Sequence, residues 1–316
     1  MFQLPRCLIL FMALGVLEFS RGAEPNEARK IAANEKVDPT VRANAIRKLT
    51  SIPFAETKPV LSNCLGVRQP LPVQMAALQV LAHYDSVDVP AIVLGAWPAM
   101  TPKIRNIAVE TLFAKPAWAG VVLDAVEKKL VLNTDLEPAR VLALQKSSDE
   151  KIRVRSAKLF TANAVSEKED VLRKYRPTLK LKGDIAKGKA LFQDSCVSCH
   201  NVGGTGEVVG PDLRSIKKRD PESLLTSILD PNREVLSKFY AYLLVTDEET
   251  IFSGMIADES ALTVTILKSD GKSETVQRAN IQKLLSTGIS AMPEGLEEKI
   301  DRQGMADLLA FLISIK

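Results

Sequence analysis

Residues 183–213 read GDIAKGKALFQDSCVSCHNVGGTGEVVGPDL and contain the most informative motif of the chain, Cys196-Val197-Ser198-Cys199-His200. Apolar side chains recur at helical spacing over residues 184–194, so we expect a helix that ends just before the first cysteine. The two thiols then lie about one helical turn apart, and the imidazole follows directly. Two thiols and an imidazole in this order are compatible with only a few kinds of site.

Three ordinary explanations leave part of the motif unused. A zinc site needs four ligands, and the chain has no second group of Cys or His. A thioredoxin-type Cys-x-x-Cys lies at a strand-to-helix junction of a βαβ fold, which is not expected here. A plain disulfide gives His200 no role. Covalent haem attachment uses every member, because Cys196 and Cys199 form thioethers to one porphyrin edge and His200 binds the iron. The motif predicts one covalent haem c.

The N-terminus, residues 1–23, has the layout of a secretory signal peptide. Arg6 is followed by the uncharged apolar run Cys7–Leu17, and small residues surround Gly22 and Ala23. A retained membrane anchor is the alternative, but a spanning helix needs about 20 apolar residues, and Glu18 interrupts this run. We expect cleavage after Gly22 or Ala23 and an exported mature chain, periplasmic or otherwise outside the cytoplasm, with no integral membrane span.

Composition indicates two globular domains. The chain has 316 residues, of which 46 % are hydrophobic and 25 % are charged. Residues 24–182 have a net charge of +8 and residues 183–316 a net charge of −5. Two solvated surfaces explain this difference, and attraction of an acidic partner is the alternative. No basic run with interleaved aromatic residues predicts nucleic-acid binding. Without Cys7 the cysteine count is odd, so we expect Cys64 to be a small buried side chain.

Residues 24–176 are predicted to be helical. One phrase recurs there, a turn followed by a β-branched residue, a polar residue and apolar residues at helical spacing. It occurs as DPTVR at 38–42, LPVQ at 71–74, TPKIR at 101–105 and DEKIR at 149–153. The β-branched residues Val41, Val73 and Ile104 are 32 and 31 residues apart, and Ile152 follows after 48. A period of this length resembles a helical-pair solenoid of the HEAT type.

Residues 177–182 follow Arg176 as a short basic linker, and residues 183–316 form the second domain. Within it, residues 238–286 alternate with a period of two and contain the turn Asp270-Gly271. This pattern predicts an inserted antiparallel β module of four or five strands. A helix is expected again from Met305 to Ile315. The predicted fold is mainly α and multidomain, an α-solenoid followed by an all-α domain with an inserted small β module.

The second domain resembles a class I cytochrome c domain. More specifically, it is similar to the haem-binding C-terminal domain of planctomycete and verrucomicrobial exported proteins, often fused behind HEAT-like repeats and a dehydrogenase-like propeller. No stretch before the solenoid is long enough for such a propeller. The matching segments are GKALF at 188–192, Cys196-x-x-Cys199-His200, Gly206-x-x-x-Gly210-Pro211-Asp212-Leu213, SAMPEG at 290–295 and DLLAFL at 307–312.

The resemblance implies roles for residues beyond the motif. The Pro211 carbonyl is expected to accept a hydrogen bond from the second imidazole nitrogen of His200. Gly188 would let the first and last helices cross closely, with Phe192 against Leu308 or Phe311.

The sixth iron ligand is expected to be a thioether, because the only other histidine of the chain is His83. Met292 is favoured because it lies in a loop and precedes Pro293. Met255 in a strand and Met305 in a packed helix are the alternatives.

Ligation by His200 and Met292 indicates one-electron transfer to or from a redox protein partner, such as an exported dehydrogenase system, rather than catalysis. The alternatives are a peroxidase-type haem enzyme with an open iron position and a solenoid interaction protein with an accessory haem. The β module could simply cover one haem edge, or it could be a docking surface for the redox partner.

Overall fold

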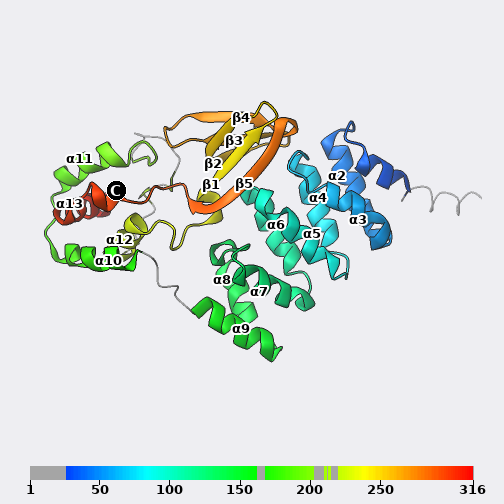
Figure 1. The fold of residues 1–316 in the computed structure, drawn as a ribbon, viewed down its shortest axis with the longest axis horizontal. Helices are drawn as coiled ribbons and strands as arrows, with labels where there is room; N and C mark the ends of the chain where they lie inside the picture. Colours follow the sequence, from blue (N-terminus) through cyan, green and yellow to red (C-terminus); the bar gives the residue numbers. More distant parts are fainter. Residues whose placement is uncertain (1–25, 162–167, 203–209, 212, 215–219, 316) are drawn as a thin grey trace, which may run out of the picture.

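The structure, a computed structural model, describes residues 26–161, 168–202, 210–211, 213–214 and 220–315. The predicted signal peptide lies outside these residues. Figure 1 shows three parts: an array of helices, a five-stranded antiparallel sheet, and a second group of helices that contains the C-terminus. The described chain is therefore mainly helical with one small sheet, as the sequence predicts.

The first part begins with helical residues 26–33. Three of its later helices start within one residue of a proline of the recurring phrase. Proline favours this position because its backbone angle is already that of a first helical turn. Its α-helices are α2 (Pro39–Arg47), α3 (Phe54–Asn63), α4 (Leu71–Leu81), α5 (Asp88–Ala96), α6 (Pro102–Leu112), α7 (Ala119–Glu127), α8 (Pro138–Gln145) and α9 (Glu150–Thr161). Its short 3-10 helices are η1 (Lys48–Ser51), η2 (Trp97–Ala99), η3 (Pro116–Trp118) and η4 (Asn133–Asp135).

Alternate helices of this part stack on one another, α2 on α4 and α4 on α6. Polar contacts join residues about one predicted repeat apart. The Thr111 hydroxyl donates to Leu78 O at 3.1 Å, 33 residues away, and the Tyr84 hydroxyl donates to Leu49 O at 2.6 Å, 35 residues away. One continuous apolar core runs through the stack and includes Cys64, which is 2 % exposed.

The sheet has the strand order β4-β3-β2-β1-β5. Its strands are β1 (Tyr240–Thr246), β2 (Ile251–Glu259), β3 (Thr263–Leu267), β4 (Ser273–Gln277) and β5 (Ile281–Ser290). Strand β1 alternates in burial, because Tyr240, Tyr242 and Leu244 face a core while Leu243 is 37 % exposed. The predicted turn at 270–271 joins β3 to β4, with Gly271 at a φ of 79°.

The buried face of the sheet packs against the first group of helices. Val67 and Leu132, from loops of that group, contact the core that contains Tyr240 and Tyr242. The Tyr242 hydroxyl also donates to Met100 O at 3.2 Å. The alternation of residues 238–286 predicts which side chains are buried, but it carries no information about the element that buries them. The sheet therefore lies between both helical groups (Figure 1) instead of covering only the second one.

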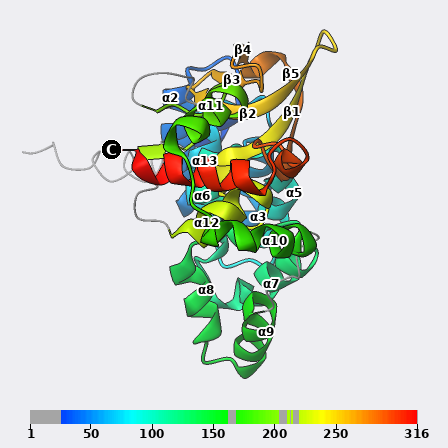
Figure 2. The same cartoon turned by 90° about the vertical axis from the view of Figure 1, so that its left-hand side faces the viewer.

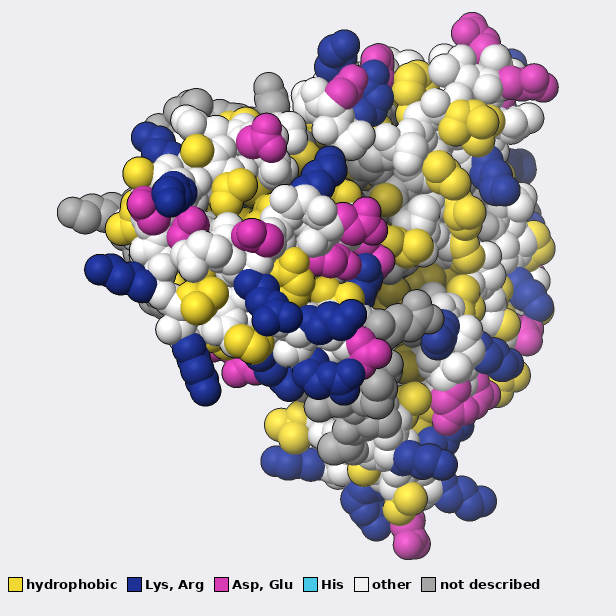
Figure 3. Space-filling model, turned by 60° about the vertical axis from the view of Figure 1, so that its left-hand side comes forward, with side chains coloured by type: hydrophobic (Ala, Val, Ile, Leu, Met, Phe, Trp, Pro, Cys, Tyr) yellow, Lys and Arg dark blue, Asp and Glu magenta, His cyan; other side chains and the backbone are white. Residues whose placement is uncertain are grey.

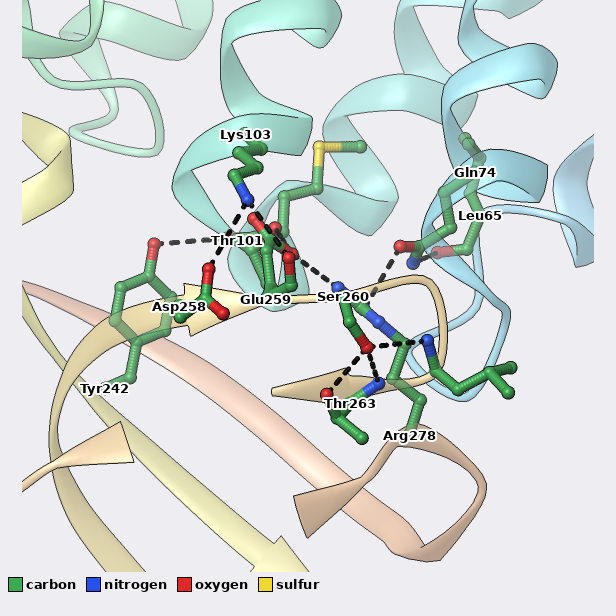
Figure 4. Close-up of polar contacts among 12 residues, drawn as sticks. Leu65, Gln74, Thr101, Lys103, Tyr242, Asp258, Glu259, Ser260, Thr263 and Arg278 are labelled. Carbon is green, nitrogen blue, oxygen red and sulfur yellow. Dashed lines mark hydrogen bonds and ion pairs between the residues drawn. The ribbon is translucent and has the colours of Figure 1, made fainter. Parts of the chain in front are cut away.

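A buried polar network reinforces this contact, as Figure 4 shows. Glu259 at the end of β2 forms an ion pair with Arg278 of η8 (Arg278–Asn280), and both side chains are 2 % exposed. Thr101, which precedes α6, donates to the Glu259 carboxylate at 2.8 Å. Arg278 donates to the side-chain oxygen of Gln74 in α4 at 3.3 Å. The network therefore joins the sheet to two helices of the stack.

The second group of helices has a separate apolar core. It consists of α10 (Glu169–Tyr175), η5 (Arg176–Lys180), α11 (Ile185–Ser195), α12 (Pro221–Leu229) and α13 (Arg302–Ser314), with the short turns η7 (Ser237–Phe239) and η9 (Leu296–Glu298). Helices α11 and α13 cross closely (Figure 2). A Cβ at position 188 would lie only 1.9 Å from Asp307 O, so the crossing requires the glycine that stands there. The rings of Phe192 and Phe311 lie 5.4 Å apart, which confirms the expected contact between the two helices.

Residues 169–180 belong structurally to this second core. Leu172 is buried in it, and Tyr175 and Leu179 pack against it. The sequence instead assigns residues up to 176 to the repeats and residues 177–182 to a linker. The basic composition of this stretch concealed three apolar residues at helical spacing, which are enough to attach a short helix.

The surface of the second group carries charges of both signs (Figure 3). Lys174, Lys180, Lys182, Lys187 and Lys189 are all exposed. Within the described residues, no helix has the length and apolar character required to cross a membrane.

Candidate functional site

The motif lies at the C-terminal end of α11. Asp184 caps the N-terminus of the helix, because its carboxylate accepts from Ala186 N at 2.9 Å and from Lys187 N at 3.2 Å. Its hydrogen bonding continues past the last helical residue, because Cys196 N donates to Phe192 O at 2.8 Å. His200 N donates in turn to Cys196 O at 2.9 Å. The backbone therefore makes one further turn through the motif and keeps both thiols and the imidazole on one compact segment.

The segment after the motif folds back onto the His200 ring. Gly210 N donates to Cys199 O at 2.8 Å, and a Cβ at Gly210 would lie 2.2 Å from His200 Cε1. Only a residue without a side chain leaves the imidazole this position. His200 Nδ1 lies 3.3 Å from Pro211 O, the carbonyl that the resemblance indicates.

These contacts define the chemical state of His200. Because a carbonyl only accepts hydrogen bonds, Nδ1 must carry the proton, and the lone pair of Nε2 remains for a ligand. Burial lowers the pKa of His200, and the Pro211 carbonyl partly opposes this shift. A neutral imidazole with one oriented lone pair is the form that binds iron.

The cysteines are free, half-buried thiols. Burial, with smaller contributions from the nearby Cys199 and Asp194, raises the pKa of Cys196 to about 11. Reactive thioredoxin-type cysteines have lowered pKa values instead. Two uncrosslinked thiols, a neutral imidazole and a glycine-lined approach fit covalent attachment of haem c.

The three candidate methionines have different surroundings. Met305 is fully buried among apolar side chains of α13 and its neighbours. Met255 of β2 is 6 % exposed and forms a small cluster with Leu267, against which Cys199 packs. Met292 is half-buried in the loop after β5 and packs against the same core as Cys196.

The sequence predicts no particular residue of the sheet in contact with Cys199. Met255 and Leu267 are buried neighbours on β2 and β3, and Phe239 and Ala291 pack beside them. The only signal available was the general expectation that the β module covers one haem edge. Gly206 and Asp212, which also match the resembled family, lie outside the described residues.

The comparison with protein families agrees with this geometry. Residues 185–238 match the family model described as Cytochrome c. The match begins with α11, includes the motif, His200 and α12, and ends before β1. A comparison with curated proteins gave no match to the chain. The match supports a haem-binding domain of the cytochrome c type in this part of the chain and, with it, haem-based electron transfer.

Proposed function

We propose that this chain is an exported electron carrier with one haem c, bound through Cys196, Cys199, His200 and Met292, that exchanges single electrons with a redox protein partner. The observation that supports this most directly is the His200 environment. Nδ1 of the ring lies 3.3 Å from Pro211 O, and Gly210 packs directly on the ring. Such fixation orients a permanent metal ligand.

Met292 is the best candidate for the second axial ligand. Met305 is completely enclosed by the core of its own helix layer, so its release would open a cavity. Met255 lies in β2 beside Cys199, and pairing with Leu267 of β3 restricts its position. Met292 lies in a loop, is only half-buried and packs against the same core as Cys196 and Val197. It is the candidate that can reach the iron with the smallest rearrangement.

The protein residues then have distinct roles. Bound haem would supply an iron that alternates between the ferric and ferrous states. His200 and Met292 would hold the iron and keep small molecules from it, so the bound group would supply outer-sphere electron transfer. Met255 and Leu267 pack against Cys199 and shield that side from water. A closed site of this kind favours electron transfer over peroxidase chemistry, which requires an open position.

The assignment of Met292 can be tested by spectroscopy of the holoprotein. Met292→Leu keeps the side-chain volume but removes the sulfur, so the oxidised protein should lose the far-red iron–sulfur charge-transfer band and its potential should fall. Met75→Leu, in the first group of helices, is the matched control and should keep both. An unchanged band in Met292→Leu would show that another residue binds the iron.

The same samples test the choice between carrier and enzyme. The carrier should bind CO and cyanide slowly, because Met292 must first leave the iron. Rapid binding by the unmodified protein would contradict a closed site and would favour the peroxidase alternative.

We also infer that residues 26–161 form a stack of helical repeats that presents a surface for partner choice. Contacts between residues 33 and 35 positions apart support this inference.

Purifying the exported protein and measuring its N-terminal residue tests the export prediction, since cleavage after Gly22 or Ala23 leaves Ala23 or Glu24 first. Proteins that co-purify with it would identify the redox partner.

A further inference from the structure

Asn232 connects the two sides of the Met292 loop. It lies in the segment between α12 and β1, far from Met292 in the sequence. Its side-chain oxygen accepts from Ser290 N at 2.7 Å, and its side-chain nitrogen donates to the Glu294 carboxylate. Ser290 and Glu294 are two residues before and two residues after Met292. One amide therefore bridges the loop across the methionine, and we call Asn232, Ser290 and Glu294 the Asn232 clamp.

We propose that Asn232 is a positioning residue that holds Met292 at the haem iron, and this proposal rests on the function proposed above, in which Met292 is the sixth ligand. The loop between β5 and η9 has no strand or helix of its own. Its internal hydrogen bonding near the methionine consists of Met292 N donating to the Ser290 hydroxyl at 3.1 Å. The loop is also held by Ala291 N, which donates to Phe239 O at 2.8 Å, and the clamp adds the contact across the methionine that limits its conformations.

The end of the loop and the residues after it are held by Lys168, which precedes α10, and by Tyr175 at the end of α10. Lys168 Nζ lies 3.1 Å from the Glu297 carboxylate and 3.5 Å from the Glu294 carboxylate. The Tyr175 hydroxyl lies 2.8 Å from Ile300 O and 3.0 Å from Glu297 O. These contacts fix Glu294 and Glu297, so the carboxylate to which Asn232 donates is itself restrained.

The segment that carries Asn232 is also restrained. Arg233, the next residue, pairs with Asp230 at 2.9 Å and with Glu169 of α10 at 2.8 Å. Pro231, which precedes Asn232, is buried. The clamp thus joins two segments that are each anchored to α10, and movement of either one would be transmitted to the methionine.

Loss of the clamp should make the iron–sulfur bond easier to displace. Asn232→Ala removes both hydrogen bonds and leaves Ser290 N and the Glu294 carboxylate without this partner. We expect imidazole, which must displace Met292 to bind ferric haem, to bind about tenfold more tightly, a factor that corresponds to about 1.4 kcal/mol. The far-red charge-transfer band should weaken without disappearing. Asn106→Ala, on the exposed side of α6, is the matched control and should behave like the unmodified protein.

Two further variants separate positioning from a general loss of structure. Asn232→Asp has nearly the same shape and can still accept from Ser290 N, but it cannot donate to Glu294 and places a negative charge beside it. It should weaken the band and raise imidazole affinity even if Asn232→Ala incorporates haem poorly. In a Met292→Leu background, Asn232→Ala should leave imidazole affinity unchanged, because no methionine remains to be displaced.

The outcomes distinguish the two proposals. If Met292→Leu keeps the charge-transfer band, the ligand assignment fails and the clamp fails with it. If Met292→Leu loses the band but both Asn232 variants match the unmodified protein in band and imidazole affinity, only the clamp is overturned. A tenfold gain in imidazole affinity that persists in the Met292→Leu background would show general loosening and would also overturn the positioning role.

Discussion

Gly210→Ala tests the geometry around His200 directly. The added methyl carbon would lie 2.2 Å from His200 Cε1, 2.5 Å from Nδ1 and 2.9 Å from Nε2. Ordinary contacts of a Cβ begin near 3.4 Å, so the ring or the loop must shift by about 1 Å. Such a shift breaks the 3.3 Å contact between Nδ1 and Pro211 O and misdirects the lone pair of Nε2.

The expected cost is the sum of two effects. Inserting a methyl group into a packed site costs about 1–3 kcal/mol, and losing the hydrogen bond costs about 0.5–1.5 kcal/mol. A loss of about 3 kcal/mol would lower the melting temperature of a domain of this size by roughly 10–20 °C. Haem-band absorbance during thermal unfolding reports on this domain specifically, and the low-temperature spectrum reports on ligation.

The chain offers a matched control in Gly95, where a Cβ would meet nothing within 4 Å. Because this residue lies inside α5, Gly95→Ala should raise stability by about 0.5–1 kcal/mol. If Gly210→Ala left the haem spectrum and the melting temperature as unaffected as Gly95→Ala, the described packing of Gly210 on the imidazole would be refuted.

Two other predictions concern buried groups outside the haem site. Burial raises the pKa of Cys64 from 9.0 to about 11, so the unfolded thiol ionises first and the free energy of unfolding should fall as the pH rises from 9 toward 11. Urea unfolding of Cys64→Ala should lack this component, and an identical pH dependence would contradict it. Glu259→Ala leaves Arg278 buried without its carboxylate and should cost about 3–5 kcal/mol. Glu274→Ala, which removes a partly exposed pair with Lys268, should cost less than about 1 kcal/mol in the same denaturation assay.

The elements that the sequence predicts well are those with a strong local period. The helical spacing of residues 184–194 corresponds to α11, the helix expected from Met305 to Ile315 overlaps α13, and the period of two corresponds to the five strands. The contact between Phe192 and Phe311 was expected because a resembled family pairs its first and last helices. Each of these predictions depends on neighbours in sequence or on a quoted motif.

The assignments that needed the tertiary structure concern partners of buried faces. The sequence assigns Leu172 and Tyr175 to the repeats, but they pack in the second core. Tyr240 and Tyr242 face the first helices although they follow α12. A period identifies a buried face, whereas its partner depends on residues far away in the chain. The same reason explains why Asn232 was not recognised: its two partners lie 58 and 62 residues later.

The sequence by itself determined the cofactor chemistry, because two thiols and an imidazole spaced as Cys196, Cys199 and His200 act within one short segment and require no distant residue. Only the tertiary structure decided how that chemistry is held. Gly210 packs on the imidazole, Met255 packs beside Cys199, and Asn232 bridges the Met292 loop because separately folded segments converge there. Covalent attachment of the haem depends on the local spacing of two thiols and an imidazole, which five residues can encode. The orientation of the iron ligands depends on packing between distant elements, so it requires the whole fold.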